Sequence, residues 1–155
     1  FLDTYRHGIQ GSQPSEDYYQ FNLACYYFQL GRFDEARDIL VRLNFHELQY
    51  KYIFKTLEIK LFFETGEEDY ELVENRLNTL KVAIHRESKM PKEKQQRYNQ
   101  FVNFMMRINR LRGQPDLNRA RLLRIYEDVR NSRNTVEWNW LMEKLKGMIG
   151  EKGAV

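Results

Sequence analysis

The sequence predicts an all-α fold of about seven helices, arranged as antiparallel helical hairpins stacked along the chain. β-Branched residues are sparse, and no alternating strand pattern persists. Prolines stand where helices would begin and glycines follow apolar helical patterns, at Pro14, Pro91, Pro115, Gly31, Gly66 and Gly113. A two-helix pattern recurs after about 35 residues. We therefore predict one helical-repeat domain over residues 1–150 and a frayed tail over 150–155.

The first predicted hairpin covers residues 15–48. Its first helix begins near Ser15, and Gly31 can take the left-handed conformation that ends it. The second helix begins at Asp34, so the turn between them is only about three residues long. Two helices joined by so short a turn must be antiparallel neighbours.

Small and aromatic residues alternate across this hairpin in a way that suits close helix packing. Ala24 and Ala36 leave room for the two helices to approach each other. Tyr27 and Phe33 fill the space beside them.

The second predicted hairpin covers residues 51–86 and repeats the first by offset. An offset of 35 places Ala24, Tyr27, Phe28 and Gly31 on Ile59, Phe62, Phe63 and Gly66. An offset of 37 places Ala36, Leu40 and Leu43 on Val73, Leu77 and Leu80. The two additional residues fall in the turn, where insertions are well tolerated.

A third hairpin is predicted over residues 91–131, followed by a terminal helix over 134–149. The inward positions of its first helix, from Pro91 to Leu111, are Tyr98, Phe101, Met105 and Ile108. Those of its second helix, from Leu117 to about Arg130, are Ala120, Leu123 and Tyr126. The terminal helix begins at Asn134 or Thr135 and carries Trp138, Leu141, Met142, Leu145 and Ile149.

These residues resemble those of a known repeat family. The residues that carry the resemblance are Ala24, Tyr27, Gly31, Phe33, Ala36 and Leu40, which look like the tetratricopeptide repeat pattern. The match covers residues 17–50 well, 51–86 by offset, and 91–130 by architecture alone. It implies a TPR-like α-solenoid in which the first helix of each pair lines a concave, ligand-binding side.

A second resemblance concerns the stretch LFFETGEEDYELVENRLNTLKVAI and the following RYNQFVNFMMRI. They resemble the C-terminal part of a group of tetratricopeptide-like proteins of Bacteroidetes bacteria, which carries no activity with it. Because the chain begins at Phe1 rather than Met, we expect it to be a segment of a longer bacterial protein.

Composition and motifs favour a cytoplasmic protein that is not an enzyme. The longest apolar run, residues 23–28, is far too short to span a bilayer. The single cysteine, Cys25, cannot form an internal disulfide, which favours a reducing compartment, and mid-helix it is better suited to packing than to nucleophilic attack. His7, His46 and His85 are scattered, and no zinc, phosphate-loop or dinucleotide motif occurs. We therefore predict no catalytic residues, no cofactor and no metal.

The favoured site is an aromatic concave groove that binds a protein or peptide, as the tetratricopeptide resemblance implies position by position. Its residues are Tyr18, Phe21, Cys25, Phe28, Gln29, Tyr52, Lys55, Ile59, Phe62 and Phe63. An apolar groove of this kind suits a segment with hydrophobic anchors. The competing interpretation is that residues 1–13 or a further repeat cover these aromatic side chains.

An alternative site is a basic patch beside the third turn. Residues 92–133 carry 11 basic and 4 acidic side chains, whereas residues 1–73 carry 7 basic and 13 acidic ones. The patch would consist of Arg107, Arg110, Arg121 and Arg124. It could bind an acidic partner or nucleic acid, or be a solvated face, and we favour a protein partner over nucleic acid.

The sequence thus predicts a non-enzymatic scaffold for protein–protein interaction, with an unspecified oligomeric state. A structural spacer within a longer chain is a further alternative, and an enzyme with dispersed catalytic residues is another.

Overall fold

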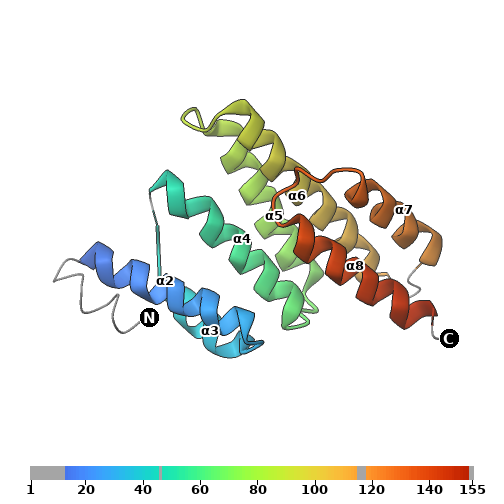
Figure 1. Cartoon of the computed structure of the whole chain (residues 1–155), viewed down its shortest axis with the longest axis horizontal. Helices are drawn as coiled ribbons and strands as arrows, with labels where there is room; N and C mark the ends of the chain where they lie inside the picture. Colours follow the sequence, from blue (N-terminus) through green and yellow to red (C-terminus); the bar gives the residue numbers. More distant parts are fainter. Residues whose placement is uncertain (1–12, 46, 115–117, 154–155) are drawn as a thin grey trace. The chain divides into compact units, whose positions relative to one another are not determined.

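The computed structural model describes residues 13–45, 47–114 and 118–153 (Figure 1). Over these ranges the chain forms seven α-helices and no strand, which confirms the all-α prediction. None of the described helices combines the length and the apolar character that a membrane crossing needs. The chain divides into two compact units, Phe1–Glu67 and Glu68–Val155, and each is described separately below. The stacking of hairpins into a solenoid, and the single domain over 1–150, stay predictions.

The first unit contains α2 (Gln13–Gln29), α3 (Phe33–Leu40) and α4 (Leu48–Glu64). Helix α2 packs along α3, and both contact α4. The first two helices therefore form the hairpin that the short turn predicts.

Ala24 and Ala36 lie at the centre of this unit, and neither has any exposed surface. Both belong to one apolar cluster, whose other buried members are Phe21, Ile39, Leu40, Phe45, Leu57 and Leu61. The small side chains allow α2 and α3 to approach closely, as expected, and α4 closes the cluster from a third side.

Helices α2 and α4 end in the same way, 35 residues apart. Gly31 and Gly66 have φ angles of +76° and +69°, in the left-handed region that glycine adopts without strain. Their amides donate to the carbonyls of Phe28 and Phe63, at 3.0 and 3.2 Å. The next amides, of Arg32 and Glu67, donate to Tyr27 and Phe62, at 2.9 and 3.0 Å. This is the Schellman motif, and the aromatic residues that the offset aligned supply equivalent carbonyls in both helices.

The second unit contains α5 (Tyr70–Arg86), α6 (Lys92–Arg112), α7 (Arg119–Arg130) and α8 (Trp138–Gly153). Helix α5 packs along α6 and α7 along α8, while α6 touches α7 less extensively. The predicted hairpin over 51–86 joins α4 to α5, which belong to different units. The extensively packed pairs of the second unit are thus α5 with α6 and α7 with α8, whereas the predicted third hairpin pairs α6 with α7.

The inward face of α6 is as predicted, and that of α7 is not. The buried residues of α6 include Tyr98, Phe101, Met105 and Ile108. In α7, Ala120 and Leu123 are exposed and Tyr126 is half-buried. Its buried residues are instead Leu122, Ile125 and Val129. Both sets have helical spacing, and packing against α8 as well as α6 selects the branched aliphatic set.

Helix α8 begins later and ends later than the sequence suggests. Residues 131–137 form a connector that is tied to α6 rather than a first helical turn. Arg97 donates its Nε to the Asn134 carbonyl at 2.8 Å, and its own carbonyl accepts the Val136 amide at 3.3 Å. The Thr135 hydroxyl lies 2.9 Å from Oε1 of Gln100. At its other end the helix continues to Gly153, where a frayed tail was expected.

The face of α8 that packs on α7 contains the predicted apolar residues. Leu141, Met142 and Leu145 are buried. Trp138 donates its indole Nε1 to the Val129 carbonyl at the end of α7, at 2.7 Å. Trp140 is also buried, so both tryptophans take part in packing.

Candidate functional site

The structure buries some of the ten residues of the predicted aromatic groove and leaves the others partly exposed. Three of them, Phe21, Tyr52 and Ile59, are at most 4% exposed. Gln29 is exposed, and the others are half-buried: Tyr18, Cys25, Phe28, Lys55, Phe62 and Phe63. The three buried side chains cannot contact a partner, and a groove formed by the remaining residues stays a prediction.

A phenylalanine without any periodic signal in the sequence contributes to the burial of two of these residues, Tyr18 and Phe21. Phe45 lies in the loop between α3 and α4 and is 8% exposed. Its ring stacks on Tyr18 with centroids 5.6 Å apart, and meets Phe21 edge-on at 5.5 Å and Phe54 at 5.7 Å. Tyr50 completes the cluster. A loop residue of the same unit therefore packs on Tyr18 and Phe21 of α2 and on Tyr50 and Phe54 of α4.

Cys25 packs against the apolar cluster of the first unit and is half-buried, which suits a packing residue.

The acidic run that follows α4, residues 67–69, takes part in local structure. Glu67 lies 3.8 Å from Arg37, and Asp69 caps α5 by accepting the Leu72 amide at 2.9 Å.

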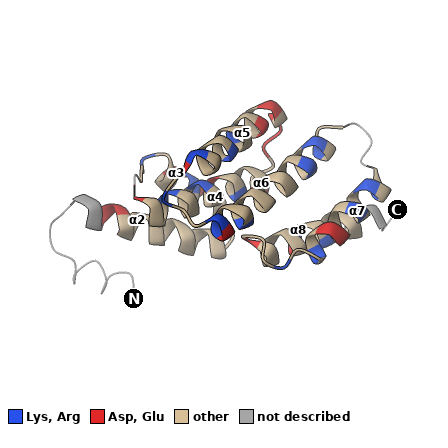
Figure 2. Ribbon diagram, turned by 90° about the horizontal axis from the view of Figure 1, so that it is seen from above, with Lys and Arg blue, Asp and Glu red and all other residues tan. Residues whose placement is uncertain are grey.

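The structure brings the four arginines of the alternative site together around one cavity in the second unit. The cavity has a volume of about 330 Å³. Its lining residues are Arg107, Arg110 and Leu111 from α6, Gln114 from the turn that follows α6, and Arg121, Arg124 and Ile125 from α7. We call it the arginine cavity. Figure 2 shows basic positions recurring along α6 and α7.

Helical spacing accounts for this convergence. On α6, Arg107, Arg110 and Leu111 follow one another at intervals of three and one, so that they share one face. On α7, Arg121, Arg124 and Ile125 share a face in the same way. Asn118 sets the start of α7, since its side chain accepts the Arg121 amide at 3.2 Å.

Arg107 is held by a carboxylate of the facing helix. Its guanidinium donates to Oδ2 of Asp128 at 2.8 Å. The two side chains remain 37% and 49% exposed, so that water and salt screen the pair.

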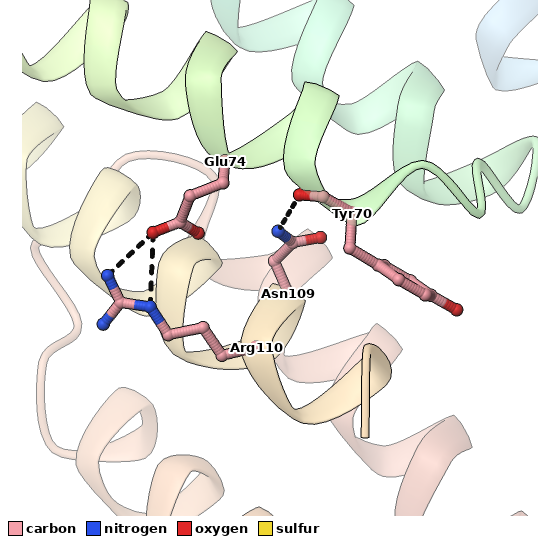
Figure 3. A network of polar contacts seen from close by, with 4 residues as sticks. All are labelled: Tyr70, Glu74, Asn109 and Arg110. Carbon is pink, nitrogen blue, oxygen red and sulfur yellow. Dashed lines mark hydrogen bonds and ion pairs between the residues drawn. The ribbon is translucent and has the colours of Figure 1, made fainter. Parts of the chain in front are cut away.

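Arg110 is held by Glu74 of α5, through only one of the two carboxylate oxygens (Figure 3). Its Nε and one terminal nitrogen both donate to Oε1 of Glu74, at 3.2 and 2.7 Å. The other carboxylate oxygen of Glu74 is buried and has no hydrogen-bond partner among the described residues. The side chain of Glu74 is only 24% exposed, so Arg110 is its principal source of compensation.

The neighbouring residues fix the end of α6 that carries these arginines. Asn109 donates its Nδ2 to the Tyr70 carbonyl at 2.9 Å. The Arg112 guanidinium lies 5.7 Å from the centre of the Tyr70 ring, and burial lowers the pKa of Arg112. Gly113 is not left-handed, unlike Gly31 and Gly66, but a Cβ there would lie 3.3 Å from the Tyr70 ring. The glycine thus permits a close approach of α5 to the end of α6.

Arg121 and Arg124 differ from the other two arginines of the cavity. Both side chains are exposed, as is that of Arg110. Within the described ranges, neither guanidinium has a hydrogen bond or an ion pair with another residue. They are therefore available to an anion without the loss of an internal contact with those residues.

Comparison with known proteins finds no match to this chain among family models, curated proteins or solved structures. The tetratricopeptide and Bacteroidetes resemblances therefore stay predictions, as does the absence of enzymatic activity. Across the described residues, no group of three or more histidine, cysteine, aspartate or glutamate side chains could hold a metal ion. Of the three histidines, His7 and His46 lie outside the described residues.

Proposed function

We propose that this chain is a non-enzymatic, TPR-like helical scaffold that binds a partner protein, and that the arginine cavity receives an acidic segment of that partner. The observation that carries the proposal is the convergence of four guanidinium groups on one cavity, two of them exposed and without internal ion pairs in the described part of the chain. The proposed contact surface therefore moves from the aromatic groove to the alternative site.

The chemistry of the cavity suits carboxylates. A guanidinium presents a planar fork of donors that matches a carboxylate with two parallel hydrogen bonds. Arg121 and Arg124 are three residues apart on one helix, so they can share one ligand. The volume of about 330 Å³ lies at the lower end of the range for ligand pockets, which suits a few side chains.

One observation favours protein over nucleic acid. Single-stranded nucleic acid is held by aromatic rings as well as cations, yet the aromatic residues of α6 are buried: Tyr98, Phe101 and Phe104. The single cysteine is the ground for proposing a cytoplasmic location.

A peptide-binding experiment tests the proposal. A fluorescein-labelled peptide of alternating glutamate and leucine is titrated with the whole chain, and its anisotropy is compared with that of a peptide in which glutamine replaces glutamate. We expect the double variant Arg121→Gln/Arg124→Gln to lose about tenfold in affinity for the acidic peptide. The matched control is Arg130→Gln, on the same helix, since Arg130 pairs with Glu127 and does not line the cavity.

Equal affinity of the double variant and the native chain would contradict the proposal. So would tight binding of a labelled RNA oligonucleotide that weakens steeply with salt and depends on the same two arginines.

A further inference from the structure

We propose that the arginine cavity recognises two carboxylates of one partner segment, the first at Arg121 and Arg124 and the second at Arg107, and that Asp128 sets the selectivity by competing for Arg107. This inference rests on the proposed function and specifies the ligand of the same cavity.

The order of residues along α7 places these groups in a line. Arg121, Arg124 and Asp128 are separated by three and four residues, so they share one face of the helix. Arg107 reaches Asp128 from α6. A segment lying along this face therefore meets two exposed guanidinium groups and then a third that already carries a carboxylate.

The third guanidinium can exchange its partner. Arg107 and Asp128 are 37% and 49% exposed, so water and salt screen their ion pair and make it weak. When a ligand carboxylate replaces Asp128, one charge-assisted hydrogen bond replaces another, and Asp128 turns to water. The second ligand carboxylate thus gains a contact with Arg107. The gain in binding free energy is smaller than at an arginine that has no ion pair to give up.

The fourth guanidinium cannot exchange its partner so readily. Glu74 has one oxygen that accepts twice from Arg110 and a second oxygen that is buried without a partner. Removing Arg110 would leave this carboxylate without compensation in a largely buried position. Arg110 therefore stays with Glu74 and forms part of the cavity wall.

The test compares two peptides against four forms of the chain. One peptide carries two glutamates four residues apart, and the other carries glutamine in place of the second glutamate. The ratio of their affinities measures the contribution of the second carboxylate alone, because all other features of the peptides are equal. The forms are the native chain and the variants Asp128→Asn, Arg107→Gln and Glu127→Gln.

We expect Asp128→Asn to increase the ratio of the two peptide affinities by about two- to fivefold, which corresponds to the free energy of an exposed ion pair. Arg107→Gln should reduce the ratio to about one, since the second carboxylate then has no cation to bind. Glu127→Gln is the matched control, because Glu127 is the neighbouring acid, pairs with Arg130 and lies outside the cavity lining. It should leave the ratio unchanged.

Either of two results with the variants would overturn the inference alone. An unchanged ratio in Asp128→Asn would show that Asp128 does not compete, and an equal increase in Glu127→Gln would show only an effect of net charge. In either case the proposed function would survive if binding still required Arg121 and Arg124. Absence of binding by both peptides to the native chain would refute the inference and the proposed function together.

Discussion

Asn109 of α6 donates its side-chain Nδ2 to the carbonyl of Tyr70, the first residue of α5, at 2.9 Å. The side chain is 3% exposed, so the contact is a buried tie between the end of one helix and the start of another. It lies beside Arg110, and it therefore positions the end of α6 that lines the arginine cavity.

Replacing Asn109 should destabilise the second unit. We expect Asn109→Ala to lower the free energy of unfolding by about 1–3 kcal/mol, because a buried hydrogen bond and buried packing are both lost. Urea denaturation followed by circular dichroism measures the change. Asn103→Ala is the control, as Asn103 is exposed on the same helix. Similar midpoints for the two variants would show that the contact does not contribute to stability.

A large side chain should not fit between α2 and α3. We expect Ala24→Trp and Ala36→Trp to destabilise the chain by about 1–3 kcal/mol or more, because both positions are completely buried. Thermal melting followed by circular dichroism reports the loss. Ala120→Trp serves as the comparison, since Ala120 is exposed on α7. A native melting temperature for either core variant would disprove the packing of this hairpin.

The two left-handed glycines should respond to alanine in the opposite sense to a helical glycine. Gly31→Ala should cost about 1–2 kcal/mol, because φ is +76° and an L-residue is strained there. Gly147→Ala should instead stabilise α8 by up to about 1 kcal/mol, since nothing lies within 4 Å of the new Cβ. Denaturant midpoints distinguish the two. Stabilisation by both substitutions would contradict the left-handed end of α2.

Stability should fall in alkaline solution through Tyr98. Burial, followed by the charge of Glu137, raises the pKa of Tyr98 above its ordinary value of 10.0, while Arg97 opposes the shift. The unfolded chain then loses this proton before the folded chain does. The stabilisation is thus complete below the unfolded pKa and is lost as pH rises toward the higher folded pKa.

Tyr98→Phe should remove this part of the pH dependence, and denaturation midpoints between about pH 8 and pH 11 would reveal it. The control is Tyr26→Phe, which alters a ring that is 49% exposed. An alkaline loss of stability of the same size in Tyr98→Phe and the native chain would refute the assignment.

Features encoded within a few residues of sequence could be predicted. The hairpin around Ala24 and Ala36 follows from a short turn and small residues at helical spacing, and both alanines are buried as that requires. Gly31 ends α2 in the left-handed conformation for an equally local reason. The basic patch was also recognisable, because arginines three residues apart share a helix face.

Features that depend on distant packing could not be predicted in the same way. Phe45 lies in a loop, where periodicity gives no signal, yet its ring packs on Tyr18 of α2 and on Phe54 of α4. The face of α7 was misassigned because α8 contributes to its burial. The carboxylates that hold Arg107 and Arg110 lie 21 and 36 residues away in sequence, so no local pattern reveals them.

The connector between α7 and α8 also bears on how the second unit opens. Its Val136 amide donates to the Arg97 carbonyl. The Arg97 side chain donates to the Asn134 carbonyl, and the Thr135 hydroxyl donates to the Gln100 side chain. A loop amide bonded in this way exchanges its hydrogen with solvent only when the contact with α6 breaks. Residues 131–137, although not helical, should therefore belong to the same cooperative opening unit as α6 and should show slow hydrogen exchange with it.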